Sequence, residues 1–389
     1  MTGTPANMPK VVIVEEGMRE GMQIESVEIT TERKVALLDA LSATGLQNIV
    51  VGSFVSPRWV PQMAHIEEVI ARFTPAPGVT YTALVLNPKG AERRDEFVPP
   101  LTVARDIGRT SVHLCDVFVK RNTAKGKVDE IALWPAVIDA AVGRGVTDAW
   151  VAINAAWGSN WVGAFSDDER IDLIGRQMVA WQARGIRPTK VWIGDPMSWN
   201  TPRAVESTLA RVLDAFPWVR DVHLHLHDGR GMAPLSAYIA MRTLGSQHTL
   251  WIDTSIGGMG GCPYCGNGRA TRMIPTEDFV HLLEAEGYET GVDLLALIEA
   301  AHLAEEIVGH ELYGHVSKAG PRPTGTALYD MDMPLVETIE EAQHFRLGSS
   351  VYDACMRPWK QPVRSADRDA VEAEWPRTVE TSNTEGDRA

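Results

Sequence analysis

Cysteine is scarce in this chain of 389 residues, which contains only four. So few cysteines exclude a disulfide-stapled scaffold and favour a reducing compartment, so we expect the cytoplasm. Long apolar runs are also missing, because no stretch approaches the roughly 18 consecutive apolar residues of a membrane-spanning helix. The first ten residues, MTGTPANMPK, have no apolar stretch after a charged head, and we expect neither a signal peptide nor a membrane partner.

An excess of positive charge is absent as well. The chain has 51 Asp and Glu against 37 Lys and Arg, which gives a formal net charge of −14. General nucleic-acid binding needs basic surface that displaces counterions, so we expect no nucleic-acid partner. What is present is an ordinary globular mixture, with 44% hydrophobic and 23% charged residues.

Eight short runs rich in Val, Ile and aromatic residues have the character of β-strands. They are residues 11–16, 48–53, 79–85, 110–116, 149–154, 190–195, 222–228 and 250–255. Stretches with helical periodicity lie between most of them, for example 30–45 and 167–185. Eight alternations of strand and helix predict an α/β fold, the (β/α)8 TIM barrel. A doubly wound open sheet is the alternative, but it often has a Gly-rich phosphate turn after its first strand, and none occurs here.

The remaining segments flank the predicted barrel. We expect an N-terminal tail over 1–9, the TIM-barrel catalytic domain over 10–290, a C-terminal helical extension over 291–363 and an acidic, disordered tail over 364–389. The extension begins with a run of helical periodicity at 293–310.

Polar side chains follow nearly all the predicted strands, at the end where the active site of a (β/α)8 enzyme lies. They are Glu15, Glu16, Ser53, Asp116, Asn154, Asp195, His227, Asp228 and Thr254. Loops are polar in general, and this accounts for part of the set. It does not account for the seventh strand.

The seventh strand, VHLHLHD, carries His223, His225 and His227 on one face, because side chains of a strand alternate between its two faces. The intervening leucines suit the helix-covered outside, so the imidazoles line the interior, where they need hydrogen bonds or a metal. His225 and His227 are about 7 Å apart along the strand, and both can turn toward one ion at the barrel mouth. A histidine satisfied within the core is the alternative, but the pair favours metal binding.

Arg19 and Glu20 stand side by side just past the first strand, in EEGMREGMQ. Glu20 would add a carboxylate to the two imidazoles and leave coordination positions open for substrate. Arg19 would supply fixed positive charge for a developing oxyanion. Taken alone, the two residues would be interpreted as a surface ion pair.

Several loops of the chain resemble, in order, those of 3-hydroxy-3-methylglutaryl-CoA lyase and the wider metal-dependent DRE-TIM metallolyase barrels. The similar segments are VEEGMREGMQIE (14–25), GSFVSPRWVPQMA (52–64), LNPKG (86–90), GDPMSWNTP (194–202), HLHDGRG (225–231) and GGMGGCPY (257–264). The resemblance covers roughly residues 10–320. It implies a C–C lyase that cleaves a 3-hydroxyacyl-CoA to acetyl-CoA and a carbonyl product in a retro-aldol or Claisen sense.

The resemblance also implies a divalent metal, Mg²⁺ or Mn²⁺ with Zn²⁺ as an alternative, CoA as part of the substrate, and a homodimer. The residues that it implies are Glu20, His225, His227 and Asn267 as metal ligands, Arg19, Asp195 and Cys262 as catalytic groups, and Gln23, Ser53, Asn154 and Lys318 as substrate-binding groups. Arg19 would stabilise the enolate, Asp195 would act as an acid or base, and Lys318 would contact a CoA phosphate.

Cys262 to Cys265 read C-P-Y-C, the spacing of a thiol–disulfide oxidoreductase. In such proteins the motif opens a helix near the front of a small βαβ domain. Here it follows the eighth strand among six glycines in residues 257–268, a composition typical of a loop that closes over a ligand. We interpret Cys262 as a lid thiol that protonates the enolate and Cys265 as incidental, with an inhibitory disulfide between them as the alternative.

The chain departs from the family pattern in three places. Glu20 stands where the family has Asp, Val50 stands where it has a glutamate, and its asparagine ligand matches Thr271 or Met273 by spacing. With Trp59, Trp157 and Trp161 expected near the pocket, these changes favour a bulkier or less polar acyl group. Two alternatives remain, a synthase that condenses acetyl-CoA with a 2-oxo acid and an inactive homologue, although synthases usually carry a longer C-terminal domain.

Overall fold

The computed structural model describes residues 3–328 of the chain. Residues up to Gly314 form one compact unit, and those from His315 onward belong to a second. The expected acidic tail, 364–389, and the part of the expected extension from residue 329 on lie outside the described residues.

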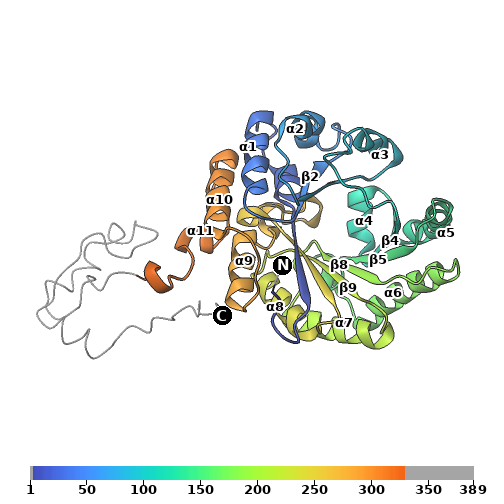
Figure 1. Cartoon of the computed structure of the whole chain (residues 1–389). Coiled ribbons are helices and arrows are strands. Elements are labelled where there is room, and N and C mark those ends of the chain that lie inside the picture. Colours follow the sequence, from blue (N-terminus) through green and yellow to red (C-terminus); the bar gives the residue numbers. More distant parts are fainter. Residues whose placement is uncertain (1–2, 329–389) are drawn as a thin grey trace, which may run out of the picture. The chain divides into compact units, whose positions relative to one another are not determined.

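Eight parallel strands make up the main sheet of the first unit (Figure 1). They are β1 (Lys10–Glu15), β2 (Asn48–Ser53), β3 (Thr80–Leu84), β4 (Ile107–His113), β5 (Asp148–Asn154), β8 (Lys190–Asp195), β9 (Asp221–Leu226) and β10 (Thr249–Thr254). Their order is β3-β2-β1-β10-β9-β8-β5-β4, and Tyr81 of β3 also pairs with Leu101, ahead of β4. This is the α/β TIM-barrel topology that the sequence predicts, with β6 (Gly158–Ser159) and β7 (Gly163–Ala164) as a small hairpin after β5.

Helices follow the strands and cover the outer face of the curled sheet (Figure 1). They are α1 (Thr31–Ser42), α2 (Ile66–Arg72), α3 (Pro88–Asp95), α4 (Asp116–Thr123), α5 (Lys127–Gly143), α6 (Asp167–Gln182), α7 (Pro202–Ala215), α8 (Ala233–Thr243), α9 (Thr276–Ala285) and α10 (Leu294–Val308). The second unit begins with α11 (Val316–Ala319). None of the described helices is both long and apolar enough to cross a membrane.

Local signals explain where several of these helices begin and end. Ser166 and Glu169 form a capping box at the start of α6, with reciprocal hydrogen bonds between side chains and backbone amides. Asp293 caps α10 by accepting from the backbone amides of its first turn, and Gly309 ends that helix in the left-handed conformation.

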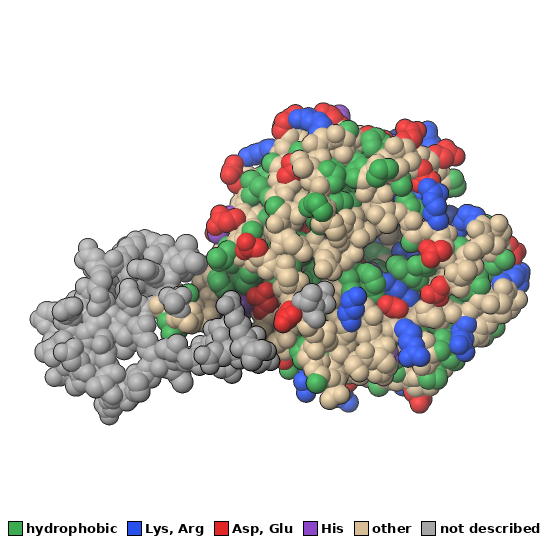
Figure 2. All heavy atoms as spheres, in the orientation of Figure 1, with side chains coloured by type: hydrophobic (Ala, Val, Ile, Leu, Met, Phe, Trp, Pro, Cys, Tyr) green, Lys and Arg blue, Asp and Glu red, His purple; other side chains and the backbone are tan. Residues whose placement is uncertain are grey.

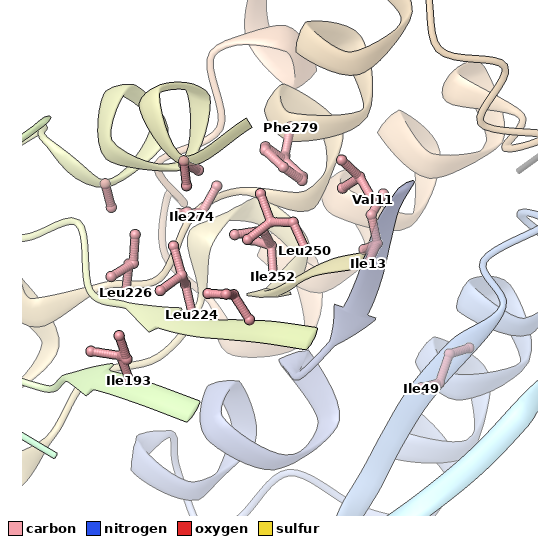
Figure 3. Close-up of a cluster of buried hydrophobic side chains, with 14 of the residues drawn as sticks. Val11, Ile13, Ile49, Ile193, Leu224, Leu226, Leu250, Ile252, Ile274 and Phe279 are labelled. Atoms are coloured by element: carbon pink, nitrogen blue, oxygen red, sulfur yellow. The ribbon is translucent and has the colours of Figure 1, made fainter. Parts of the chain in front are cut away.

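The hydrophobic core lies between the outer face of the sheet and the helices (Figure 3). Leu224 and Leu226 of β9 and Ile252 of β10 are fully buried there, as is Phe279 of α9. Burying each such side chain contributes roughly 1.5–3 kcal/mol. The leucines of β9 therefore face outward, and its histidines face the barrel interior, as the alternation predicts.

One local expectation is wrong. β4 ends at His113, and Asp116 lies in the first turn of α4, where the thiol of Cys115 accepts a hydrogen bond from the backbone amide of Phe118. The apolar pattern runs on past the strand, which shifted the expected strand by three residues.

Acidic and basic side chains are interspersed over the face of the molecule shown in Figure 2. Charges of both signs therefore alternate on this face.

Candidate active site

Three buried side chains at the carboxyl ends of β1 and β9 converge on one point. Glu20 lies in η1 (Gly17–Gly21), the helical turn after β1, and His225 and His227 lie in and just beyond β9. The three offer one ligand atom each, and these atoms all lie within 4.8 Å of one another. Nε2 of His227 is 3.2 Å from Nε2 of His225 and 3.8 Å from Oε1 of Glu20.

Both imidazoles are fixed through their other nitrogen. Nδ1 of His225 is 2.8 Å from Oδ2 of Asp253, whose Oδ1 is 2.6 Å from Nε2 of His223. Nδ1 of His227 hydrogen-bonds to the backbone carbonyl oxygen of Thr271. Ionised carboxylate and carbonyl oxygens only accept hydrogen bonds, so both Nδ1 atoms donate, and both Nε2 atoms face the centre of the cluster.

Burial and neighbouring charges set the ionisation of the cluster. Burial lowers the pKa of His227 to about 4, with a further contribution from His225. Burial also opposes a charge on His225, but Asp253 outweighs it and raises the pKa of His225. Burial would likewise raise the pKa of Glu20, but Arg19 and the histidines outweigh it and the pKa is lowered. The cluster thus combines an ionised carboxylate, a neutral imidazole and an imidazole that readily holds a proton.

This donor set fits a divalent metal ion. Two Nε2 lone pairs at 3.2 Å repel each other unless a proton or a cation lies between them. Two imidazoles and one carboxylate leave further coordination positions for a substrate, as in catalytic metal sites. Imidazole suits Zn²⁺ and carboxylate suits Mg²⁺ and Mn²⁺, so the donor set accepts any of the three.

Arg19 is bound into the same cluster. Its Nε donates to Oε2 of Glu16 at 2.7 Å, and its Nη1 hydrogen-bonds to Oε2 of Glu20. Nε2 of Gln23 donates to that same Glu20 oxygen at 2.9 Å. The Arg19 side chain is only 16% exposed, so the pair is a largely buried one and not a surface ion pair. Arg19 and Gln23 leave Oε1 of Glu20 turned toward His227.

Asp195 ends β8 beside the histidine strand and is fully buried. Its Oδ2 accepts from the backbone amide and the side-chain Nδ2 of Asn200, at 2.6 and 2.7 Å. The same Nδ2 donates to the carbonyl oxygen of His227 at 3.0 Å. Oδ1 has no hydrogen-bond partner within the described part of the chain. Burial raises the pKa of Asp195, which leaves a carboxylate with one oxygen fixed and the other unused.

The loop after β10 carries the C-P-Y-C segment. The backbone amide of Cys262 donates to Oγ1 of Thr271 at 2.8 Å. The thiols of Cys262 and Cys265 hydrogen-bond to each other, and this bond together with burial raises the pKa of Cys265. Sγ of Cys265 also donates to the carbonyl oxygen of Pro196, next to Asp195, at 2.9 Å. Both cysteines are free thiols, and the segment forms a three-residue 3-10 turn rather than the start of an α-helix.

The same loop returns past the metal-ligand cluster at Met273. This residue is fully buried and pairs with His227 in an antiparallel bridge. A Cβ built on Gly260 would lie 3.1 Å from Cγ of Met273 and 3.3 Å from Cγ of Glu20, and the φ of Gly260 is 122°. Met273 therefore packs near Glu20, while Thr271 contributes its backbone oxygen to His227.

The other predicted site residues lie further from the cluster or contact it indirectly. Ser53 and Asn154 end β2 and β5, at the barrel mouth. Asn267 is exposed in the loop after β10, whereas Glu20, His225 and His227 are buried, and its role as a fourth metal ligand stays a prediction. Lys318 lies in α11, in the second unit, and its role stays a prediction.

His113 and Glu130 form a pair that the sequence interpretation missed. Nδ1 of His113 is 2.8 Å from Oε1 of Glu130, and its Nε2 is 3.2 Å from Nδ2 of Asn154. The hydrogen bonds at this end of the barrel thus continue from β4 to β5. Placing the end of β4 at His113 rather than Asp116 would have revealed the pair.

The tryptophans near the site also differ from those expected. Trp157 is buried and donates to Thr208 of α7, so it faces the helices, and Trp59 is 77% exposed. Trp150, Trp192 and Trp251 line the barrel interior instead, around His223. These tryptophans stand at the alternate positions of β5, β8 and β10 that face the barrel interior, and this alternation could have identified them from the sequence.

Comparison with known proteins gives a consistent answer. The family model described as HMGL-like matches residues 10–304. The 3-hydroxy-3-isohexenylglutaryl-CoA/hydroxymethylglutaryl-CoA lyase of Pseudomonas aeruginosa is 34% identical over 321 residues, which are 80% of this chain and 98% of that protein. Human mitochondrial hydroxymethylglutaryl-CoA lyase is 30% identical over 319 residues, covering 82% of this chain and 92% of its own.

Solved structures agree in fold. An HMG-CoA lyase from Acinetobacter baumannii, in complex with coenzyme A and 3-methylmalate, has a TM-score of 0.67 at 26% identity and covers 85% of this chain and 99% of its own. The hydroxymethylglutaryl-CoA lyase of Pseudomonas aeruginosa has a TM-score of 0.66 at 30% identity, over 80% of this chain and 98% of its own. With the family model spanning the whole barrel, these matches show that the chain belongs to the HMGL-like family, the family of hydroxymethylglutaryl-CoA lyase.

Proposed function

We propose that this chain is a divalent-metal-dependent carbon–carbon lyase that cleaves a 3-hydroxyacyl-CoA related to 3-hydroxy-3-methylglutaryl-CoA. The products are acetyl-CoA, or a related acyl-CoA, and a carbonyl compound. The observation that carries the proposal is the convergence of Glu20, His225 and His227 at the barrel mouth, with Arg19 bound to the same carboxylate. The named relatives are lyases of this type.

Glu20, His225 and His227 are the residues that would hold the metal. When bound, a divalent ion would bring the substrate hydroxyl and an acyl oxygen together and make the hydroxyl more acidic. Asp253 and the carbonyl oxygen of Thr271 keep both Nε2 atoms directed at that position.

Asp195 is suited to accept the hydroxyl proton. Its unpartnered Oδ1 is available, its Oδ2 is fixed by Asn200, and its raised pKa makes it a stronger base than an ordinary carboxylate. As the proton leaves, the hydroxyl carbon becomes a carbonyl and the electron pair of the C–C bond passes to the acyl-CoA fragment.

Arg19 and Cys262 act on that fragment. The pair of electrons forms an enolate, and the guanidinium of Arg19 supplies positive charge for its oxygen. The partly exposed thiol of Cys262 then delivers a proton to the enolate carbon, which completes acetyl-CoA. Cys265 stays protonated and holds the loop through Pro196.

Three finer points rest on the family resemblance. We infer Mg²⁺ or Mn²⁺ as the ion, a homodimer as the assembly and the cytoplasm as the location. The exposed Asn267 and Lys318 remain the proposed fourth metal ligand and a proposed CoA contact.

The direct test is a panel of 3-hydroxyacyl-CoA esters, 3-hydroxy-3-methylglutaryl-CoA included, incubated with the purified chain. The expected result is release of acetyl-CoA that stops with EDTA and returns with added Mg²⁺ or Mn²⁺. An Asp195→Asn variant is the matched control, because it keeps the shape of the side chain and removes the base. Condensation of acetyl-CoA with a 2-oxo acid, without cleavage of any ester, would instead indicate a synthase.

A further inference from the structure

β4 lies three strands away from the histidine strand β9 in the order of the sheet, and its inner face is polar. Gly108, Thr110 and Val112 point outward, since Gly108 packs on the ring of Trp181 in α6 and the hydroxyl of Thr110 accepts a hydrogen bond from the indole nitrogen of that same tryptophan. Arg109 and Ser111, which alternate with them, therefore face the barrel interior. Both are exposed to solvent, so water reaches this inner face.

Arg109 is a cation without a matching anion. Its guanidinium carbon lies 5.3 Å from the centre of the Trp192 ring. Among residues 3–328, no carboxylate forms an ion pair with it and no acceptor takes a hydrogen bond from it. Five N–H donors thus remain available inside the barrel.

Trp192 connects this cation to the metal-ligand cluster. Its indole ring stacks on the imidazole of His225, with centroids 5.5 Å apart and planes at 28°. Trp192 therefore contacts both the guanidinium of Arg109 and the imidazole of His225. A substrate held at the cluster can lay an apolar segment along the indole and bring its far end to Arg109.

A second cation, Lys190, lies on the inner face of β8. Nζ of Lys190 lies 3.8 Å from the ring centres of both Trp150 and Trp251. The lysine is only 3% exposed, so it is enclosed between the rings and does not offer itself to a ligand. Arg109 is thus the cation on this face that a substrate can reach.

We propose that Arg109 is a specificity-determining residue that binds a carboxylate at the far end of the substrate's acyl chain. This inference rests on the proposed lyase function and deepens it. The segment between the reacting carbons and the carboxylate lies on Trp192, so it is longer than the single methylene arm of a 3-hydroxy-3-methylglutaryl group. A neutral chain that covered the guanidinium would displace its water without offering an acceptor, which disfavours its binding.

The test compares two 3-hydroxyacyl-CoA esters of equal length, one ending in a carboxylate after four to six methylene groups and the other in its methyl ester. Binding is measured by calorimetry in the metal-loaded protein, and turnover is measured separately. The wild type should bind the acid more tightly by roughly 10- to 100-fold. Arg109→Gln should remove this preference and leave the methyl ester nearly unchanged, and Arg109→Lys should keep part of it.

Arg105→Gln is the matched control, because Arg105 is exposed and pairs with Asp95 outside the barrel. Equal affinity of the wild type for acid and ester would overturn the inference, whether or not any variant folds. Equal weakening of both ligands by Arg109→Gln would also overturn it. That result would indicate that Arg109 acts by packing on Trp192 and not by binding the carboxylate. Binding with the predicted preference but without cleavage would contradict the lyase function alone.

Discussion

The Nε2 atoms of His225 and His227 face each other at 3.2 Å, while their Nδ1 atoms donate to Asp253 and to the carbonyl oxygen of Thr271. This arrangement requires a positive charge between the rings, carried by a proton or a metal ion. Because the metal replaces a proton, its affinity should fall as the pH is lowered. Asp253 and the carbonyl oxygen of Thr271 are therefore part of the site, because they orient the two imidazoles.

Asp253→Asn should weaken metal binding by roughly 10- to 100-fold without abolishing it, because the variant loses the charged partner that orients His225. Metal affinity measured by competition with a chelator checks this. Asp221→Asn is a suitable control, since Asp221 accepts from Trp251 at the other end of the barrel. An affinity identical to that of the wild type would show that Asp253 is dispensable for orienting the ligand.

Arg19→Met should lower kcat by about 10²-fold or more, because it removes one preorganised partner of the developing oxyanion. The measurement is made at saturating metal, since Arg19 also contacts Glu20. Metal content determined on the same sample separates the two effects. A normal kcat with full metal occupancy would reduce Arg19 to a structural ion-pair partner.

The pH dependence of kcat/KM should reflect Asp195. The base must be ionised, and burial raises its pKa above the ordinary carboxylate value, so activity should decline on the acid side at a higher pH than for an ordinary aspartate. Asn200→Ala removes the side-chain hydrogen bond to Oδ2, which stabilises the ionised form of Asp195, and should move this limb to still higher pH. An acid limb that is unmoved in Asn200→Ala would indicate a different base.

Cys262→Ser should impair turnover strongly and leave the fold intact, whereas Cys265→Ser should have little effect under reducing conditions. The reason is that proton delivery needs one thiol, and the raised pKa of Cys265 keeps its thiol protonated. Steady-state kinetics and a disulfide-reductase assay are run side by side on both variants. Equal and complete loss in both, with reductase activity in the wild type, would support a redox dithiol instead.

Periodicity predicted most of the fold from the sequence. Strands repeat every second residue and the amphipathic helices every three to four, so β9 and α6 are recognisable without a structure. The failure at β4 has the same origin, because apolar residues continue beyond His113 and hide the turn before α4. The short helical turn over Gly17–Gly21, which carries Glu20 to the histidines, has no such periodic signal.

The candidate site was predictable where its residues share one strand. His225 and His227 follow from alternation within β9 alone. Asp253 and Thr271 were missed because their roles depend on the alignment of β10 with β9 and on a backbone oxygen in a loop, neither of which local sequence encodes. Arg109 was missed for the same reason, since its neighbour Trp192 comes from a distant strand.

Metal content of the histidine variants tests the central claim most directly. The purified protein, loaded with Mn²⁺ and desalted, should retain about one ion per chain, and His225→Ala and His227→Ala should each lose it. His65→Ala, a substitution of an exposed histidine outside the cluster, should retain it. Loss of acetyl-CoA release in the same two variants is the result that the account predicts, and full metal occupancy in both would contradict it.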